Sequence, residues 1–101
     1  TAMASIKEQV YEFYELADEL RKGSKLLEEK VAEHEKKREQ YFKYYNNRNN
    51  LTVDDEIVAY ELRIEANEEL EELHAFRNKL LSKRERMEEL SQSLVDAGFW
   101  Q

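Results

Sequence analysis

The sequence contains no cysteine and no proline, and only two glycines, Gly23 and Gly98. Without cysteine there is no disulfide, no thiolate nucleophile and no cysteine-based zinc site. Proline and glycine are the residues that most disfavour a helix interior, so their scarcity favours long helices. Long apolar runs and a charged-then-apolar signal segment are also missing, and we therefore expect no membrane span and a cytoplasmic protein.

The residues that are present are those of a helical protein. Charged residues make up 39% of the 101 positions and hydrophobic residues 41%, with Glu, Lys, Leu, Arg and Ala in the majority. These residues lose little conformational freedom in a helix. A disordered acidic chain would lack the apolar share, so the composition is typical of a long helix or a coiled coil in one domain, residues 1–101.

Apolar residues recur at alternating steps of four and three in both halves, the spacing of a coiled-coil seam. Nine of the twelve positions of the first series are apolar: Ile6, Val10, Phe13, Ala17, Leu20, Ser24, Leu27, Val31, His34, Arg38, Tyr41 and Tyr45. Ten of the twelve positions of the second are apolar: Ala59, Leu62, Ala66, Glu69, Leu73, Phe76, Leu80, Lys83, Met87, Leu90, Leu94 and Ala97. Neither series slips in phase. The pattern predicts one helix over about 5–46, continuous through Gly23 although bent there, and another over about 53–97.

Four asparagines between these helices predict a turn over 47–52: Asn46, Asn47, Asn49 and Asn50. Asparagine tolerates left-handed backbone and bonds to its own main chain, so it interrupts helices. Thr52 has the position of an N-cap residue, and Gly98, followed by Phe99, that of a C-terminal stop that bonds back to Leu94. A short connection places two long helices antiparallel. The predicted fold is all-α, a long antiparallel helical hairpin forming a two-helix coiled coil.

Two registers of the hairpin are compatible with the seam, in which facing residue numbers add to 100 or to 107. The second value places Arg38 beside Glu69 and Ser24 beside Lys83, whereas the first offers the flanking pairs Lys30–Glu72 and Lys37–Glu65. Buried polar mismatches cost more than exposed ion pairs contribute, which favours 107.

Aromatic residues gather near the turn and near the two termini, in larger numbers than a two-helix seam can bury. Apolar residues on the outer side of the second helix add a further stripe. The candidate interaction residues are Tyr11, Tyr14, Tyr41, Phe42, Tyr44, Tyr45, Ile57, Tyr60, Ile64, Phe99 and Trp100. One interpretation is that the rings cap the ends of a slender hairpin with their hydroxyls in water. The other, which we favour, is that they contact another chain, and Trp100 is the residue most expected to dock.

A lone hairpin of this length has little core, so two hairpins are expected to pair into a four-helix bundle, as a homodimer or with another protein. The net charge of −7 argues against nucleic acid and anionic membrane as partners. Residues 54–72 hold nine acids against Arg63, and residues 77–86 hold five bases against Glu85. A nucleic-acid-associated regulator using segment 77–86 remains the alternative.

The sequence contains only weak indications of a metal site or a catalytic site. Glu71 and His74 have the spacing of a di-iron ligand pair, but their heptad positions face away from the seam. His34 lies in the seam, where a polar residue weakens packing and helps to set register. No nucleophile–base set or phosphate loop is present, so we expect no enzyme, cofactor, metal or small-molecule substrate. The predicted function is a non-catalytic, self-associating adaptor, assembly factor or small chaperone.

Overall fold

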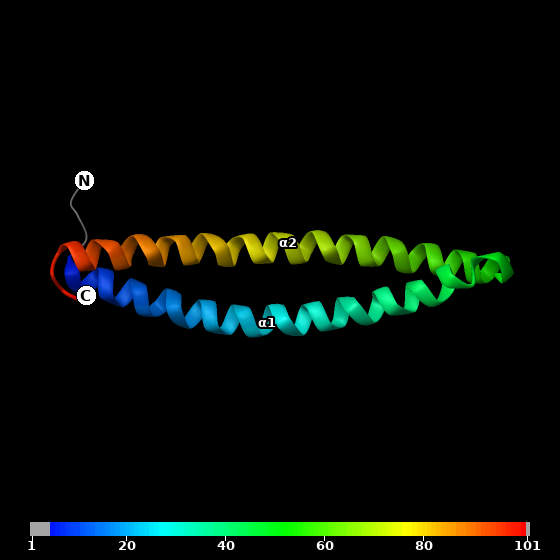
Figure 1. Ribbon diagram of the computed structural model, residues 1–101, viewed down its shortest axis with the longest axis horizontal. Coiled ribbons are helices and arrows are strands. Elements are labelled where there is room, and N and C mark those ends of the chain that lie inside the picture. The colour runs from blue at the N-terminus through cyan, green and yellow to red at the C-terminus, as the bar shows by residue number, and fades with distance from the viewer. Residues whose placement is uncertain (1–4, 101) are drawn as a thin grey trace. The chain divides into compact units, whose positions relative to one another are not determined.

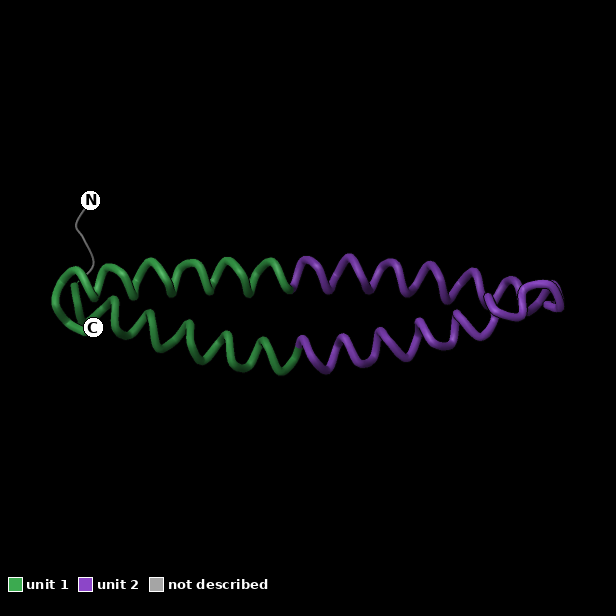
Figure 2. The backbone as a smooth tube through the Cα atoms, in the orientation of Figure 1, with its two compact units in different colours: residues 1–26, 77–101 green, residues 27–76 purple. Residues whose placement is uncertain are grey.

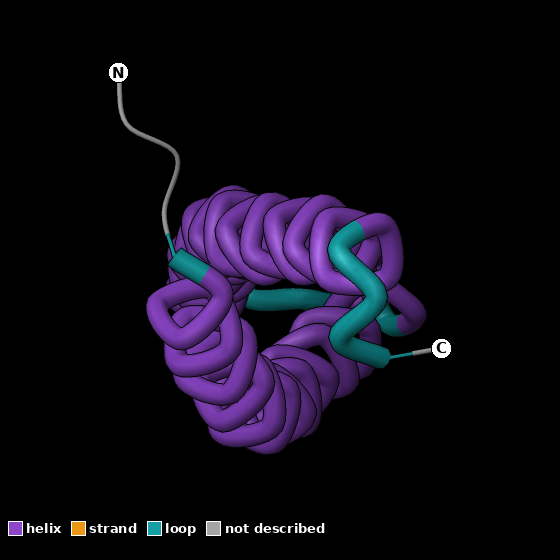
Figure 3. The backbone as a smooth tube through the Cα atoms, turned by 90° about the vertical axis from the view of Figure 1, so that its left-hand side faces the viewer, coloured by secondary structure: helices purple, strands orange, loops and turns teal. Residues whose placement is uncertain are grey.

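The computed structural model describes residues 5–100 as two long helices packed against each other in a hairpin (Figure 1). Helix α1 spans Ile6–Asn46, the short 3₁₀ helix η1 spans Arg48–Asn50, and helix α2 spans Val53–Asp96. No strand occurs in this part of the chain. The predicted all-α hairpin is confirmed, with helix bounds within a residue of those expected. Within residues 5–100, loop segments occur only at the ends of the helices (Figure 3).

The chain divides into two compact units, each containing a stretch of both helices (Figure 2). Unit 1 comprises residues 1–26 and 77–101 and therefore holds the two termini. Unit 2 comprises residues 27–76 and holds the turn. The surfaces described below each lie within one unit.

The N-terminus of α2 is closed by two reciprocal hydrogen bonds. The Asp55 N–H donates to Thr52 Oγ1 at 3.1 Å, and the Thr52 N–H donates to Asp55 Oδ2 at 3.4 Å. This capping box satisfies N–H groups that have no partner within the helix. Helix α1 begins similarly, because the Glu8 N–H donates to Ser5 Oγ at 3.2 Å. The N-cap role predicted for Thr52 is confirmed, and the Ser-x-x-Glu signal at residue 5 was missed.

The C-terminus of α2 ends at Gly98, which has a φ of 75°. The Phe99 N–H donates to the Leu94 carbonyl and the Gly98 N–H to the Val95 carbonyl, both at 2.9 Å. These two bonds define a Schellman motif, in which glycine adopts the left-handed conformation without steric cost. The stop predicted from the sequence is confirmed.

The asparagine turn differs from the expectation in its backbone. No non-glycine residue among the described positions has a positive φ, so the asparagines do not adopt left-handed backbone. The chain instead tightens into η1, where the Asn50 N–H donates to the Asn47 carbonyl at 3.0 Å. Arg48 completes the end of α1, because its Nη1 donates to the Tyr45 carbonyl at 3.0 Å. The Asn47 N–H likewise donates to the Tyr44 carbonyl at 3.0 Å, so carbonyls at the end of α1 find donors without left-handed backbone.

Few side chains are buried within the described hairpin. The buried apolar residues are Leu90 and Leu94 in unit 1 and Ala59 and Ala66 in unit 2, and the buried polar residue is His34. Helix α1 continues through Gly23 without interruption. A Cβ atom at Gly23 would overlap Leu80 Cδ2, so this glycine allows Leu80 to approach the α1 backbone.

The register lies between the two values expected from the seam. In unit 1 Gly23 faces Leu80, and in unit 2 His34 faces Glu69, and both pairs of numbers add to 103. His34 and Glu69 occupy the same heptad position in their two helices, whereas Gly23 lies beside the seam, next to Ser24. Polar seam residues do face each other, as expected, but Glu69 is paired with His34 and Lys37 and not with Arg38.

Candidate protein-interaction surfaces

Sixteen large hydrophobic side chains are exposed among residues 5–100, against four buried apolar residues. Eight of the eleven candidate interaction residues belong to the exposed set, and Tyr41, Tyr44 and Trp100 are partly buried. Contiguous exposed apolar side chains mark interaction sites more often than scattered ones do. The fold brings some of these side chains together and leaves others apart.

In unit 1 four rings form a continuous chain, which we call the terminal ring cluster: Phe13, Tyr14, Phe99 and Trp100. Trp100 contacts Phe13 edge-to-face with ring centroids 4.9 Å apart. Phe99 lies 5.7 Å from Trp100, and Tyr14 lies 5.9 Å from Phe13. The Schellman motif turns the chain after α2 so that Trp100 reaches α1. Trp100 thus docks on its own chain, whereas Tyr14 and Phe99 remain 62% and 52% exposed.

Tyr11 adds to this surface from the same helix. It is 64% exposed, and Lys7 Nζ lies 5.8 Å from its ring centroid. About two to three turns further along α1, Arg21 pairs with Asp18 at 2.6 Å. Helix α1 therefore carries charges of both signs in the stretch that holds Tyr11 and Tyr14.

In unit 2 three of the four adjacent aromatics of α1 pack together, which we call the turn ring cluster: Tyr41, Phe42 and Tyr45. Their ring centroids are 5.6 to 6.4 Å apart. Arg38 lies over Phe42 at 5.6 Å and Arg48 over Tyr45 at 4.5 Å, contacts that use the negative face of each ring. The cluster is stabilised by its own arginines, but Phe42 and Tyr45 stay 42% and 46% exposed.

Tyr44 is separated from that cluster. It lines an open hollow of about 570 Å³ together with Leu51, Val58 and Leu62. Helical geometry explains the separation: at about 100° of rotation per residue, positions 41, 42 and 45 lie within about 100° of one another, whereas position 44 lies on the other side of position 41, about 160° from position 42. The sequence grouped all four rings, and the structure brings only three together.

The outer face of α2 in unit 2 carries an apolar row, which we call the outer stripe: Val53, Ile57, Tyr60 and Ile64. Their side chains are 73%, 52%, 66% and 44% exposed. The steps of four, three and four place them on one face of the helix, opposite the seam that buries Ala59 and Ala66. Val53 was missed at the sequence level because it was assigned only to the start of the helix, although its spacing to Ile57 was visible.

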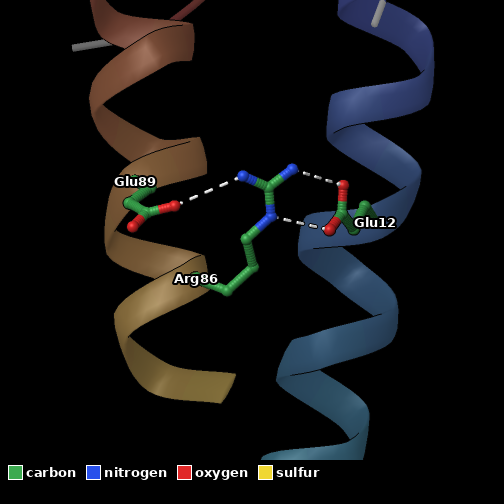
Figure 4. A network of polar contacts seen from close by, with 3 residues as sticks. All are labelled: Glu12, Arg86 and Glu89. Carbon is green, nitrogen blue, oxygen red and sulfur yellow. Dashed lines mark hydrogen bonds and ion pairs between the residues drawn. The ribbon is translucent and has the colours of Figure 1, made fainter. Parts of the chain in front are cut away.

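The basic segment 77–86 is largely occupied by acids of the same chain. Arg86 donates to both carboxylate oxygens of Glu12, at 2.8 and 3.1 Å, and to Glu89 at 3.3 Å (Figure 4). The hydrogen bonds from the Arg86 guanidinium lower the pKa of the Glu12 carboxyl below its ordinary value. Lys83 pairs with Glu19 at 3.1 Å, and Arg84 lies 3.3 Å from Glu88. Three of the five bases that would grip phosphates are thus already paired.

A second polar group lies in unit 2 at the seam. His34 Nδ1 lies 3.5 Å from Glu69 Oε2 but makes no hydrogen bond, and Lys37 Nζ contacts Glu69 Oε1. The Lys37 ammonium, and secondarily His34, lower the pKa of the Glu69 carboxyl, and Glu69 in turn raises the pKa of Lys37. The group has the form of a structural pair that fixes register.

Within residues 5–100 no three His, Asp or Glu side chains lie close enough together to hold a metal ion, and both Glu71 and His74 are exposed. Neither helix contains a stretch apolar enough to span a bilayer in this part of the chain. In comparisons with protein-family models, with curated proteins and with solved structures, nothing matched this chain. A functional assignment therefore depends on the surfaces described above.

Proposed function

We propose that this chain is a non-catalytic protein–protein interaction module that self-associates and acts as an adaptor, assembly factor or small chaperone. One observation carries the proposal: rings and aliphatic side chains are concentrated on faces that the facing helix of the hairpin leaves uncovered. Burying such surface against another chain is favourable by about 25 cal/mol per Å² of apolar area. Tyr and Trp are frequent anchors at such surfaces.

The surface of unit 1 is the one best suited to a second copy. Tyr11, Tyr14 and Phe99 are more than half exposed there, and the neighbouring charges include Lys7, Asp18 and Arg21. A two-fold interface brings the same patch of two copies together, so it needs a patch whose charges can complement themselves. Mixed charge meets that condition, whereas a patch of one sign does not.

Light scattering on a sizing column over a hundredfold concentration range tests the proposal. We expect the mass to rise from 12.2 kDa towards twice that value as concentration increases. The double variant Tyr11→Ser with Tyr14→Ser should remain monomeric over the same range, and Tyr60→Ser, on the outer stripe, is the matched control that should associate like wild type. A monomeric wild type at every concentration would overturn self-association, and association unaffected by the double variant would overturn its assignment to unit 1.

A further inference from the structure

The outer stripe of α2 is an apolar row with no partner in its own unit. Val53, Ile57, Tyr60 and Ile64 span eleven residue steps, or about 17 Å at 1.5 Å per residue. No hydrogen bond, ion pair or ring contact of the described chain involves these four side chains. Their steps of four, three and four are those by which one helix packs against another.

The charges that flank the stripe are almost all negative. Asp54, Glu56, Glu61 and Glu68 lie one helical turn from stripe residues, and all four are exposed. None of them forms an ion pair within the described part of the chain, whereas Arg63 is the one base between residues 54 and 72. Glu12 and Glu19 in unit 1 and Glu69 at the seam of unit 2 are, by contrast, paired across the helices. The acidic rim of the stripe is therefore not neutralised within its own unit.

The shape of the outer stripe and the charge of its rim together indicate which kind of partner it can bind. A straight helix presents no strand edge for an extended peptide, so the partner has to interdigitate side chains, as an amphipathic helix does. Negative flanks favour Lys and Arg beside the apolar face of that helix. A second copy of the stripe would bring two acidic rims together, which costs free energy. Of the five bases that another copy could offer from segment 77–86, three are already paired, with Glu12, Glu19 and Glu88.

We propose that the outer stripe, Val53, Ile57, Tyr60 and Ile64 with its acidic rim, binds a basic amphipathic helix of a different protein. This inference rests on the proposed interaction function and names the partner class for one of its surfaces. The proposed self-association uses unit 1, whereas the outer stripe lies in unit 2. Either proposal can therefore fail while the other holds.

Two designed peptides of equal length test the inference on the full chain. Both carry leucine at the spacing of the stripe; one has lysine at every flanking position and the other has glutamate. We expect the lysine peptide to bind at least tenfold more tightly in a fluorescence titration at low salt, and its affinity to fall as salt is raised because the rim is exposed.

Variants of the chain separate the apolar and electrostatic contributions. Ile57→Ala with Tyr60→Ala should weaken the lysine peptide by about tenfold or more, as expected for central apolar anchors. Glu61→Gln with Glu68→Gln should weaken it about threefold to tenfold and reduce its salt dependence. Leu81→Ala and Glu85→Gln, exposed positions of unit 1, are the matched controls and should leave the affinity unchanged.

Equal affinity for both peptides, or binding of neither, would overturn the inference. So would a loss of self-association in the Ile57→Ala, Tyr60→Ala variant, because a second copy would then occupy the stripe. Helical content measured by circular dichroism for each variant excludes unfolding as the cause of lost binding. If the chain alone is monomeric but the lysine peptide still binds selectively, self-association fails and the inference stands.

Discussion

Leu80 packs directly over Gly23 on the facing helix of unit 1, so close that a Cβ atom at position 23 would overlap Leu80 Cδ2. A glycine in the interior of a 41-residue helix is usually a weakness, costing about 1 kcal/mol relative to alanine. Here it provides the space for a seam leucine. The same residue thus lowers helix propensity and improves packing.

This relationship predicts coupling between positions 23 and 80. Gly23→Ala in a Leu80→Ala background should raise the free energy of unfolding by about 1 kcal/mol, the full gain in helix propensity. In the wild-type background the gain should be close to zero, because Leu80 has to leave its rotamer at a cost of about 1 kcal/mol. Urea denaturation of the four chains at one concentration measures the difference. Equal gains in both backgrounds would mean that Leu80 moves away freely.

The Glu69 carboxylate predicts a loss of stability in acid. Lys37 and, to a smaller extent, His34 hold its pKa below the ordinary value of 4.5. The unfolded chain then binds more protons than the folded chain at the same pH, so the contribution is present above about pH 4.5 and disappears as pH falls through the lower, folded pKa.

Unfolding measured from pH 6 to pH 3 tests this sign. Between pH 6 and pH 3 the free energy of unfolding should fall further in wild type than in Glu69→Gln. The difference should be below about 1 kcal/mol, because the pair is partly exposed. Glu12 and Asp18 also have lowered pKa values and contribute a background that both chains share. Glu85→Gln, at an exposed position, serves as the control. Identical pH profiles for wild type and Glu69→Gln would contradict the expectation.

His34 is expected to reduce stability while it fixes the register. It is buried, and its Nδ1 makes no hydrogen bond although Glu69 Oε2 lies 3.5 Å away. A buried polar atom without a hydrogen bond is costly, and replacing such groups by apolar side chains is often stabilising. His34→Leu should therefore raise the free energy of unfolding by about 1 kcal/mol, measured by thermal or urea denaturation. A decrease of that size would show that the imidazole contributes net stabilisation.

Gly98 connects the end of α2 to the position of Trp100. Its φ of 75° disfavours a side chain, whereas no atom lies within 4 Å of a Cβ placed there, so Gly98→Ala should cost about 1 kcal/mol from backbone strain alone. Because Trp100 is the one tryptophan of the chain, its fluorescence reports on the contact with Phe13.

In Gly98→Ala the emission of Trp100 should shift to longer wavelength and become easier to quench, as the ring leaves Phe13. Gly98→Asn is the matched control, since asparagine adopts left-handed backbone more readily, and it should keep most of the wild-type spectrum. An unchanged spectrum in Gly98→Ala would show that the ring contact, rather than the glycine, holds the end of the chain.

Much of this protein follows from local sequence. The unbroken heptad phase predicts two helices, the Thr52 hydroxyl and Gly98 mark the beginning and end of α2, and asparagines interrupt the helices after Asn46. Each of these features is decided by residues within a few positions of one another, so the sequence contains the necessary information. The outer stripe is likewise visible in the sequence, because its face depends only on the geometry of one helix.

The tertiary structure decided what depends on residues far apart in the chain. The heptad pattern repeats every seven residues and is therefore compatible with several registers, and contacts such as Gly23 with Leu80 and His34 with Glu69 select one between those expected. The same pairing determines that Trp100 rests on Phe13 and that Arg86 is held by Glu12. Sequence periodicity determines which face of each helix is apolar. Only the packing of one helix on the other determines which residues become buried and which stay exposed.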